Sequence, residues 1–149
     1  MGPMIGQAAA EQPALASQIA ETGLLAESLW INVALAGVTI IAIIALAREV
    51  RTPRAQLIIA ATLFVPVVSL ASYSALISGL TVSLTTLPAA HPAGGAPVLT
   101  LWGRYLTWTI STPLILLALG LLAGSNLTKL FVVVSADIAM CVTGLAAAL

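Results

Sequence analysis

The sequence predicts an all-α, polytopic membrane protein, and three observations lead to this fold class. Hydrophobic residues make up 60% of the 149 residues and charged residues only 7%, whereas a soluble domain carries about a quarter charged residues. The mean hydropathy is +1.13. The few charges leave four long apolar runs, each near the ~20 residues with which a helix crosses about 30 Å of hydrocarbon.

Composition also excludes several classes of protein. The net charge is zero and no basic cluster is large enough for nucleic acid, so the expected partner is the lipid bilayer. The single cysteine, Cys141, cannot form an intramolecular disulfide. With one histidine, His91, the chain cannot build a multi-histidine metal site.

Turn-forming sequences separate the predicted spans. Pro53 opens the second helix, at a first-turn position that proline tolerates. Segment 87–97 is rich in proline and glycine, and Gly124 is a predicted helix stop. Residues 1–27 are predicted to form an N-terminal tail outside the bilayer, with an amphipathic turn around Ile19–Leu25. The predicted membrane domain covers 28–149, with spans at about 29–46, 55–80, 98–123 and 128–149.

Basic residues predict the orientation of these spans. Arg48, Arg51 and Arg54 flank the first loop and Lys129 flanks the third, and the positive-inside rule puts both loops in the cytoplasm. The N-terminus is then outside, in a multi-pass protein of the cell membrane. The last apolar run has no polar flank before Leu149, so we expect the chain to be the front part of a longer protein.

Two ionisable side chains, Arg104 and Asp137, fall inside the predicted third and fourth spans. Each is a candidate functional group, because a charge in hydrocarbon is costly. The two can pair across neighbouring antiparallel helices. Asp137 can instead be a neutral acid that donates a hydrogen bond between helices, since burial disfavours its charged form.

Hydroxyl and indole groups share the helical stripe of Arg104. Thr107 and Trp108 follow at i+3 and i+4, and Ser111 and Thr112 at i+7 and i+8. The stripe holds one positive charge and no negative charge, and a buried arginine needs compensation. A mobile anion held by the hydroxyls is one interpretation; the alternative is that they bond to carbonyls of their own helix. Trp108 is expected to pack against another helix or a flat ligand.

Several segments resemble a known family. The stretch "WGRYLTW" (102–108) with "STP" (111–113), followed by "DIAMCVTGLAAAL" (137–149), is similar to the third and fourth helices of the haloarchaeal microbial rhodopsins, and more narrowly of the halorhodopsins. Segments 28–37 and 65–81 resemble the first two helices of that family, and 88–95 its outer loop. The resemblance implies the first four helices of a seven-helix bundle that binds retinal through a lysine of the last helix. The one lysine here, Lys129, does not match that position.

The resemblance also implies roles for individual residues in a light-driven inward chloride pump, which is not an enzyme. Arg104, Thr107 and Ser111 would bind chloride. Proton-pumping relatives have aspartates at the positions of Thr107 and Ala118. Asp137 matches a buried carboxylic acid of the family. His91 matches an outer-loop histidine, with a role in anion entry or as an ordinary exposed side chain. The residues that match retinal-pocket positions are Tyr105, Trp108, Thr112, Met140, Cys141 and Gly144. Homo-trimers are common in the family.

Two other functions stay open on the sequence alone. A sensory rhodopsin that signals to a transducer is one, although such proteins usually keep a carboxylate at the Thr107 position. A four-helix membrane subunit without a chromophore is the other, and it predicts that a chain of this length is stable by itself.

Overall fold

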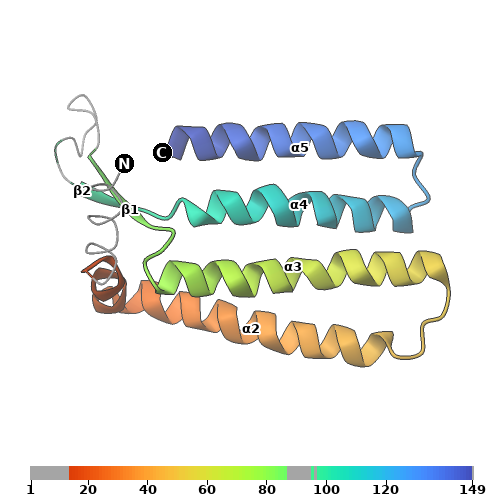
Figure 1. Ribbon diagram of the computed structural model, residues 1–149, viewed down its shortest axis with the longest axis horizontal. Helices are drawn as coiled ribbons and strands as arrows, with labels where there is room; N and C mark the ends of the chain where they lie inside the picture. Colours follow the sequence, from red (N-terminus) through yellow and green to blue (C-terminus); the bar gives the residue numbers. More distant parts are fainter. Residues whose placement is uncertain (1–13, 87–94, 96, 149) are drawn as a thin grey trace, which may run out of the picture.

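The computed structural model describes residues 14–86, 95 and 97–148. Four long helices lie side by side in chain order and alternate in direction (Figure 1). They are α2 (Gly23–Ala47), α3 (Pro53–Ile77), α4 (Gly103–Leu122) and α5 (Leu127–Ala148). Each helix packs against the next one along the chain, and all four are long and apolar enough to cross a membrane. The described residues thus confirm the predicted mainly helical membrane fold.

The third membrane helix starts later than the sequence predicts. The sequence places its start near Val98, but Pro97–Thr100 forms strand β2, which pairs antiparallel with β1 (Ser83–Thr86). Backbone groups that bond across this hairpin cannot also bond along a helix, so α4 begins at Gly103. Arg104 therefore lies in the first turn of α4, closer to the hairpin end than predicted. His91 and the rest of 87–94 lie outside the described residues.

The second membrane helix also ends earlier than predicted. Helix α3 stops at Ile77 rather than near residue 80. Gly79 has a φ of 76°, a left-handed conformation that glycine adopts without steric cost and that terminates a helix. The chain then turns directly into the hairpin.

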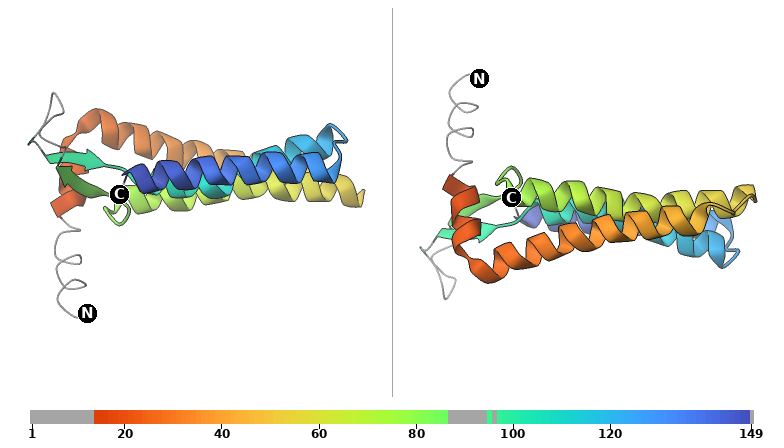
Figure 2. Two further views of the ribbon diagram at one scale, coloured as in Figure 1. Left: turned by 90° about the horizontal axis from the view of Figure 1, so that it is seen from above. Right: turned by 90° about the horizontal axis from the view of Figure 1, so that it is seen from below.

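An apolar cluster closes the hairpin end of the bundle. Residues 14–21, inside the expected N-terminal tail, are helical and lie at the same end as the hairpin (Figure 2). Ile19 is 2% exposed and packs with Leu29 of α2, Leu76 of α3 and Val82. This segment is therefore held by apolar burial against the ends of two membrane helices.

A side chain joins two helices at the opposite end. Arg54 Nη2 donates a hydrogen bond of 2.5 Å to the carbonyl of Leu121, in the last turn of α4. A cation is favourable there because the carboxyl end of a helix carries partial negative charge. Gly124, with a φ of 69°, then reverses the chain into α5. This contact links the start of α3 to the end of α4.

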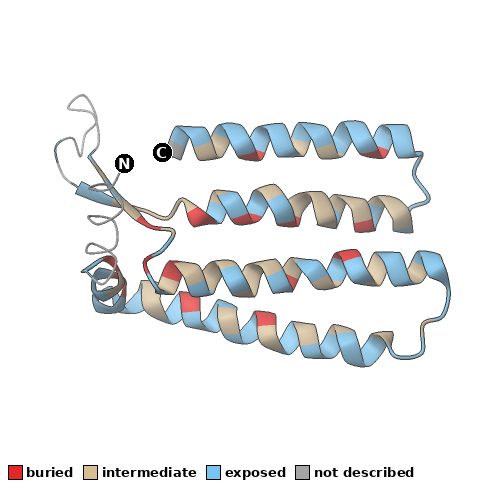
Figure 3. Cartoon of the chain, viewed as in Figure 1, coloured by how far each residue is buried: buried red, intermediate tan, exposed pale blue. Residues whose placement is uncertain are grey.

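Few side chains of the described residues are buried, and the helices keep large apolar groups exposed (Figure 3). Phe64 of α3 is 58% exposed and Phe131 of α5 is 74% exposed. Such surfaces suit contact with lipid or with further helices, because hydrocarbon does not penalise them as water would.

We expect Ile19→Ser to loosen the N-terminal segment, because it removes a buried side chain and introduces a buried hydroxyl. The free energy of unfolding should fall by about 2–4 kcal/mol, and limited proteolysis should cut faster near residues 14–21. The matched control is Ala20→Ser, at the adjacent exposed position. Equal proteolysis rates in the two variants would contradict the packing described above.

Candidate functional site

Helix α4 presents its functional side chains on two different faces. Gly103, Thr107, Ser111 and Ala118 are its buried residues, and Thr107 contacts α3. Thr112 instead contacts α5. Successive helical residues are about 100° apart, so positions 107 and 111 share one face while 108 and 112 share another. The single stripe expected from the sequence is therefore divided between two neighbouring helices.

The face toward α3 contains a cluster of hydroxyl groups. Thr107 is 8% exposed, and its hydroxyl donates to the Gly103 carbonyl at 2.8 Å. The same oxygen is hydrogen-bonded to Ser72 Oγ of α3, and Ser72 Oγ also lies 3.3 Å from the Gly103 carbonyl. Thr107 thus makes the bond to its own helix that was the alternative expectation, and it also bonds across to α3.

Ser111 lies one turn further along the same face. Its side chain is only 5% exposed, and none of the hydrogen bonds among the described residues uses its hydroxyl. Among the described residues, Thr81 Oγ1 is the one enclosed side-chain oxygen without a partner, so the Ser111 oxygen is not enclosed. Its hydroxyl is therefore accessible to a group that these four helices do not supply.

Arg104 lies in a cleft at the hairpin end. Its Cζ is 5.7 Å from the centroid of the Trp108 ring, a cation–π distance. Trp108 packs edge-on against Tyr105, with ring centroids 5.5 Å apart and an angle of 73° between planes. The cleft has a volume of about 610 Å³, and the hairpin adds Thr85 and Thr100 to its wall. None of its lining residues in the described part of the chain is acidic.

Asp137 has a partner other than Arg104. Thr112 Oγ1 lies 2.5 Å from Asp137 Oδ2 and 3.7 Å from Cys141 Sγ, and it also donates to the Trp108 carbonyl at 2.8 Å. Asp137 lies level with Thr112, whereas Arg104 is eight residues earlier, in the first turn of α4, about 12 Å away along the bundle at 1.5 Å per residue. No ion pair joins the two among the described residues.

Gly144 allows an aromatic ring to approach α5. A Cβ at Gly144 would lie 3.2 Å from Tyr105 Cδ1 and 3.3 Å from Cε1, so the missing side chain makes room for the Tyr105 ring. Trp108 and Tyr105 line the cleft, Cys141 is 3% exposed and Met140 is 63% exposed. The expected retinal residues thus form an aromatic wall on α4 and a mixed surface on α5.

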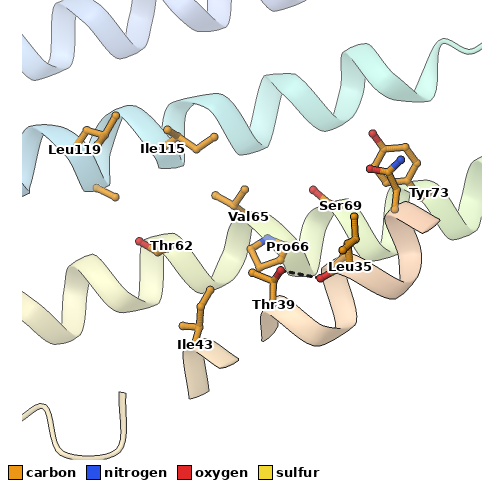
Figure 4. A pocket seen from close by; sticks show the side chains of 13 residues that line it. Leu35, Thr39, Ile43, Thr62, Val65, Pro66, Ser69, Tyr73, Ile115 and Leu119 are labelled. Atoms are coloured by element: carbon orange, nitrogen blue, oxygen red, sulfur yellow. Dashed lines mark hydrogen bonds between the residues drawn. The ribbon is translucent and has the colours of Figure 1, made fainter. Parts of the chain in front are cut away.

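A second hollow lies between α2, α3 and α4, away from Arg104 (Figure 4). Its volume is about 460 Å³. Thr39 donates to the Leu35 carbonyl at 2.7 Å and Thr62 to the Ile58 carbonyl at 2.8 Å, so these hydroxyls are satisfied by their own helices. Ala118 also lines it, and no charged group does so among the described residues.

Sequence reasoning missed Ser72. The only signal was a hydroxyl within an apolar span, and Ser69, Ser74 and Ser78 give the same signal. Which of them faces α4 depends on how α3 is rotated about its axis, and that rotation follows from packing rather than from the sequence of one helix.

Comparison with known proteins identifies close relatives. The halorhodopsin of Halorubrum sodomense is 65% identical over 126 residues, which cover 85% of this chain and 45% of the relative. A solved structure named as halorhodopsin, a light-driven chloride pump, is 56% identical with a TM-score of 0.83, covering 87% of this chain and 54% of that one. A bromide-bound halorhodopsin from Halobacterium salinarum is 54% identical with the same TM-score, covering 88% and 54%. The chain spans about half the length of the curated relatives it matches.

The family assignment rests on a wider comparison. The profile of the bacteriorhodopsin-like proteins matches residues 24–149, which include all four membrane helices and every described residue of the candidate site. The structural matches place these helices as the first helices of the family's bundle. The resemblance found in the sequence is thus confirmed, and the chain belongs to the bacteriorhodopsin-like protein family.

Proposed function

We propose that this chain forms the first four helices of a light-driven inward chloride pump that uses retinal. The observation that supports this most is the cleft around Arg104, whose described lining has a cation and hydroxyls but no acid. The relatives named halorhodopsin, at 53–65% identity, support the same function. An anion is the simplest source of the missing negative charge.

Electrostatics favours an anion at this end of α4. Arg104 adds its charge to the positive end of the helix dipole, so the local potential attracts anions and is not offset by a carboxylate in the cleft. Ser111, Thr107 and Ser72 do not line this cleft. They lie where α4 packs on α3, and there the Ser111 hydroxyl can donate its proton to a halide. These residues would hold chloride by charge and by hydrogen bonds, without a fixed counter-ion.

This chain supplies part of a pocket that fits retinal. When bound, it would supply the absorption of light and a change of shape that drives transport. Tyr105 and Trp108 offer it an aromatic wall, and Thr112 fixes Asp137 beside that wall. Lys129 stands in the first turn of α5, at the arginine-rich end, and does not line the cleft. The attachment lysine must therefore belong to the rest of the bundle.

The membrane orientation is part of the proposal. The end with Arg48, Arg51, Arg54 and Lys129 would face the cytoplasm, and the hairpin, the tail 1–27 and His91 would face outside. Chloride would then enter from the hairpin end, where the Arg104 cleft lies and where His91 could assist, and leave at the basic end. The complete protein would assemble into homo-trimers, which are common in the family.

The complete pigment, with its remaining helices and retinal supplied, should show a visible band that shifts with chloride concentration. Ser111→Ala should raise the chloride dissociation constant about tenfold, the equivalent of one charge-assisted hydrogen bond of about 1.4 kcal/mol. Spectral titration from zero to molar chloride measures both effects. Ser135→Ala, at an exposed position of α5, is the control. An absorption maximum that does not change with chloride concentration would contradict the proposed anion site.

We expect Thr107→Asp to weaken chloride binding at least tenfold, roughly the effect of a like charge near the site. The new carboxylate, one turn from Arg104 on the face of α4 toward α3, would add a fixed negative charge near the arginine and could accept a proton. Vesicle assays of light-driven chloride and proton movement check this, with Thr107→Asn as the uncharged control of similar size. Undiminished chloride transport by the aspartate variant would contradict the assignment.

A further inference from the structure

The start of α4 touches the segment after α3 at a point where no side chain can be added. The Gly103 N–H donates to the Thr81 carbonyl at 3.1 Å, and the Thr81 side chain lies directly over the Gly103 Cα. A Cβ built on Gly103 would lie 2.5 Å from Thr81 Cβ, well inside van der Waals contact. Rotating the Thr81 side chain cannot relieve this overlap, because the position of a Cβ is set by the backbone.

Gly103 is also the residue through which the candidate anion ligands are held. Its carbonyl accepts hydrogen bonds from Thr107 Oγ1 at 2.8 Å and from Ser72 Oγ at 3.3 Å. Arg104 follows it directly in the chain. A displacement of Gly103 therefore moves the Thr107 hydroxyl, the Ser72 contact and the base of the Arg104 side chain together.

We propose that Gly103 and Thr81 form a positioning pair that sets where Arg104 and Thr107 stand relative to the bound halide. This inference rests on the proposed function of the cleft as a chloride site. The close contact fixes the height of the first turn of α4 against the α3–β1 segment. A side chain at position 103 would displace that turn by about 1 Å, and binding groups lose effectiveness when displaced by more than about 0.5 Å.

The shape of Thr81, rather than its polarity, carries this role. Its hydroxyl is buried and has no hydrogen-bond partner among the described residues. An isosteric apolar side chain would therefore keep the contact with Gly103 without losing any bond. This separates the positioning role from a direct polar role of Thr81 in anion binding.

The test measures halide affinity and thermal stability separately in the complete retinal-bound pigment. Gly103→Ala should raise the chloride dissociation constant about tenfold or more. The double variant Thr81→Gly/Gly103→Ala removes the overlap and should restore the dissociation constant to within about threefold of the original. Thr81→Val should leave it unchanged. Gly120→Ala is the control for a glycine substitution in α4 away from the cleft: a Cβ there would lie 2.5 Å from Leu130 Cδ1, the end of a flexible side chain that can rotate away. This variant should leave halide affinity unchanged.

Each outcome decides the proposal. An unchanged dissociation constant in Gly103→Ala, or no recovery in the double variant, overturns it. If Gly103→Ala does not assemble a pigment, recovery of both pigment and affinity in the double variant supports it, and continued failure overturns it. If the unmodified protein responds to chloride and Gly103→Ala has the same chloride dissociation constant, only the positioning role is overturned. A chloride-insensitive unmodified protein overturns the proposed function as well.

Discussion

The positive charge of Arg104 is the constraint on which the rest of the site depends. It stands in the first turn of α4, where the helix dipole is also positive, and its cleft has no acidic residue in the described lining. The Trp108 ring gives a cation–π contact, worth about 0.5–2 kcal/mol, which does not neutralise the charge. Within these four helices, the attraction for an anion therefore remains unsatisfied.

The packing of α4 keeps the nearest membrane-embedded acid away from this charge. One face of the helix bonds to α3 through Thr107 and Ser72, and the other bonds to α5 through Thr112 and Asp137. The Asp137 carboxyl group bonds to Thr112, so it stabilises the contact between α4 and α5. The two polar connections thus have different roles: one joins α4 to α3 beside the proposed anion site, and the other fixes α5 beside the aromatic wall.

The sequence was sufficient for the features that depend on composition and on local rules. Four apolar runs predicted four helices, and Gly124 predicted the turn before α5. It could not show that Pro97–Thr100 pairs with Ser83–Thr86, since strand pairing depends on contacts between distant residues, and Arg104 was consequently placed too deep. It also could not identify Ser72, because the rotation of α3 against α4 is set by packing of both helices. The residue pattern around Arg104, taken with the family resemblance, placed Arg104, Tyr105 and Trp108 in one group, and these three residues do line one cleft; the chloride-binding role of Arg104, Thr107 and Ser111 stays a prediction.

The most direct test of the account is a crystal structure of the complete retinal-bound protein in concentrated bromide, with the anomalous scattering of bromide measured. The account predicts a bromide peak within about 3.5 Å of Ser111 Oγ, a hydrogen-bonding distance for a large anion, in the polar region that includes Arg104 and Thr107. A structure in which carboxylates of the protein neutralise Arg104, with no bromide beside Ser111, would contradict it.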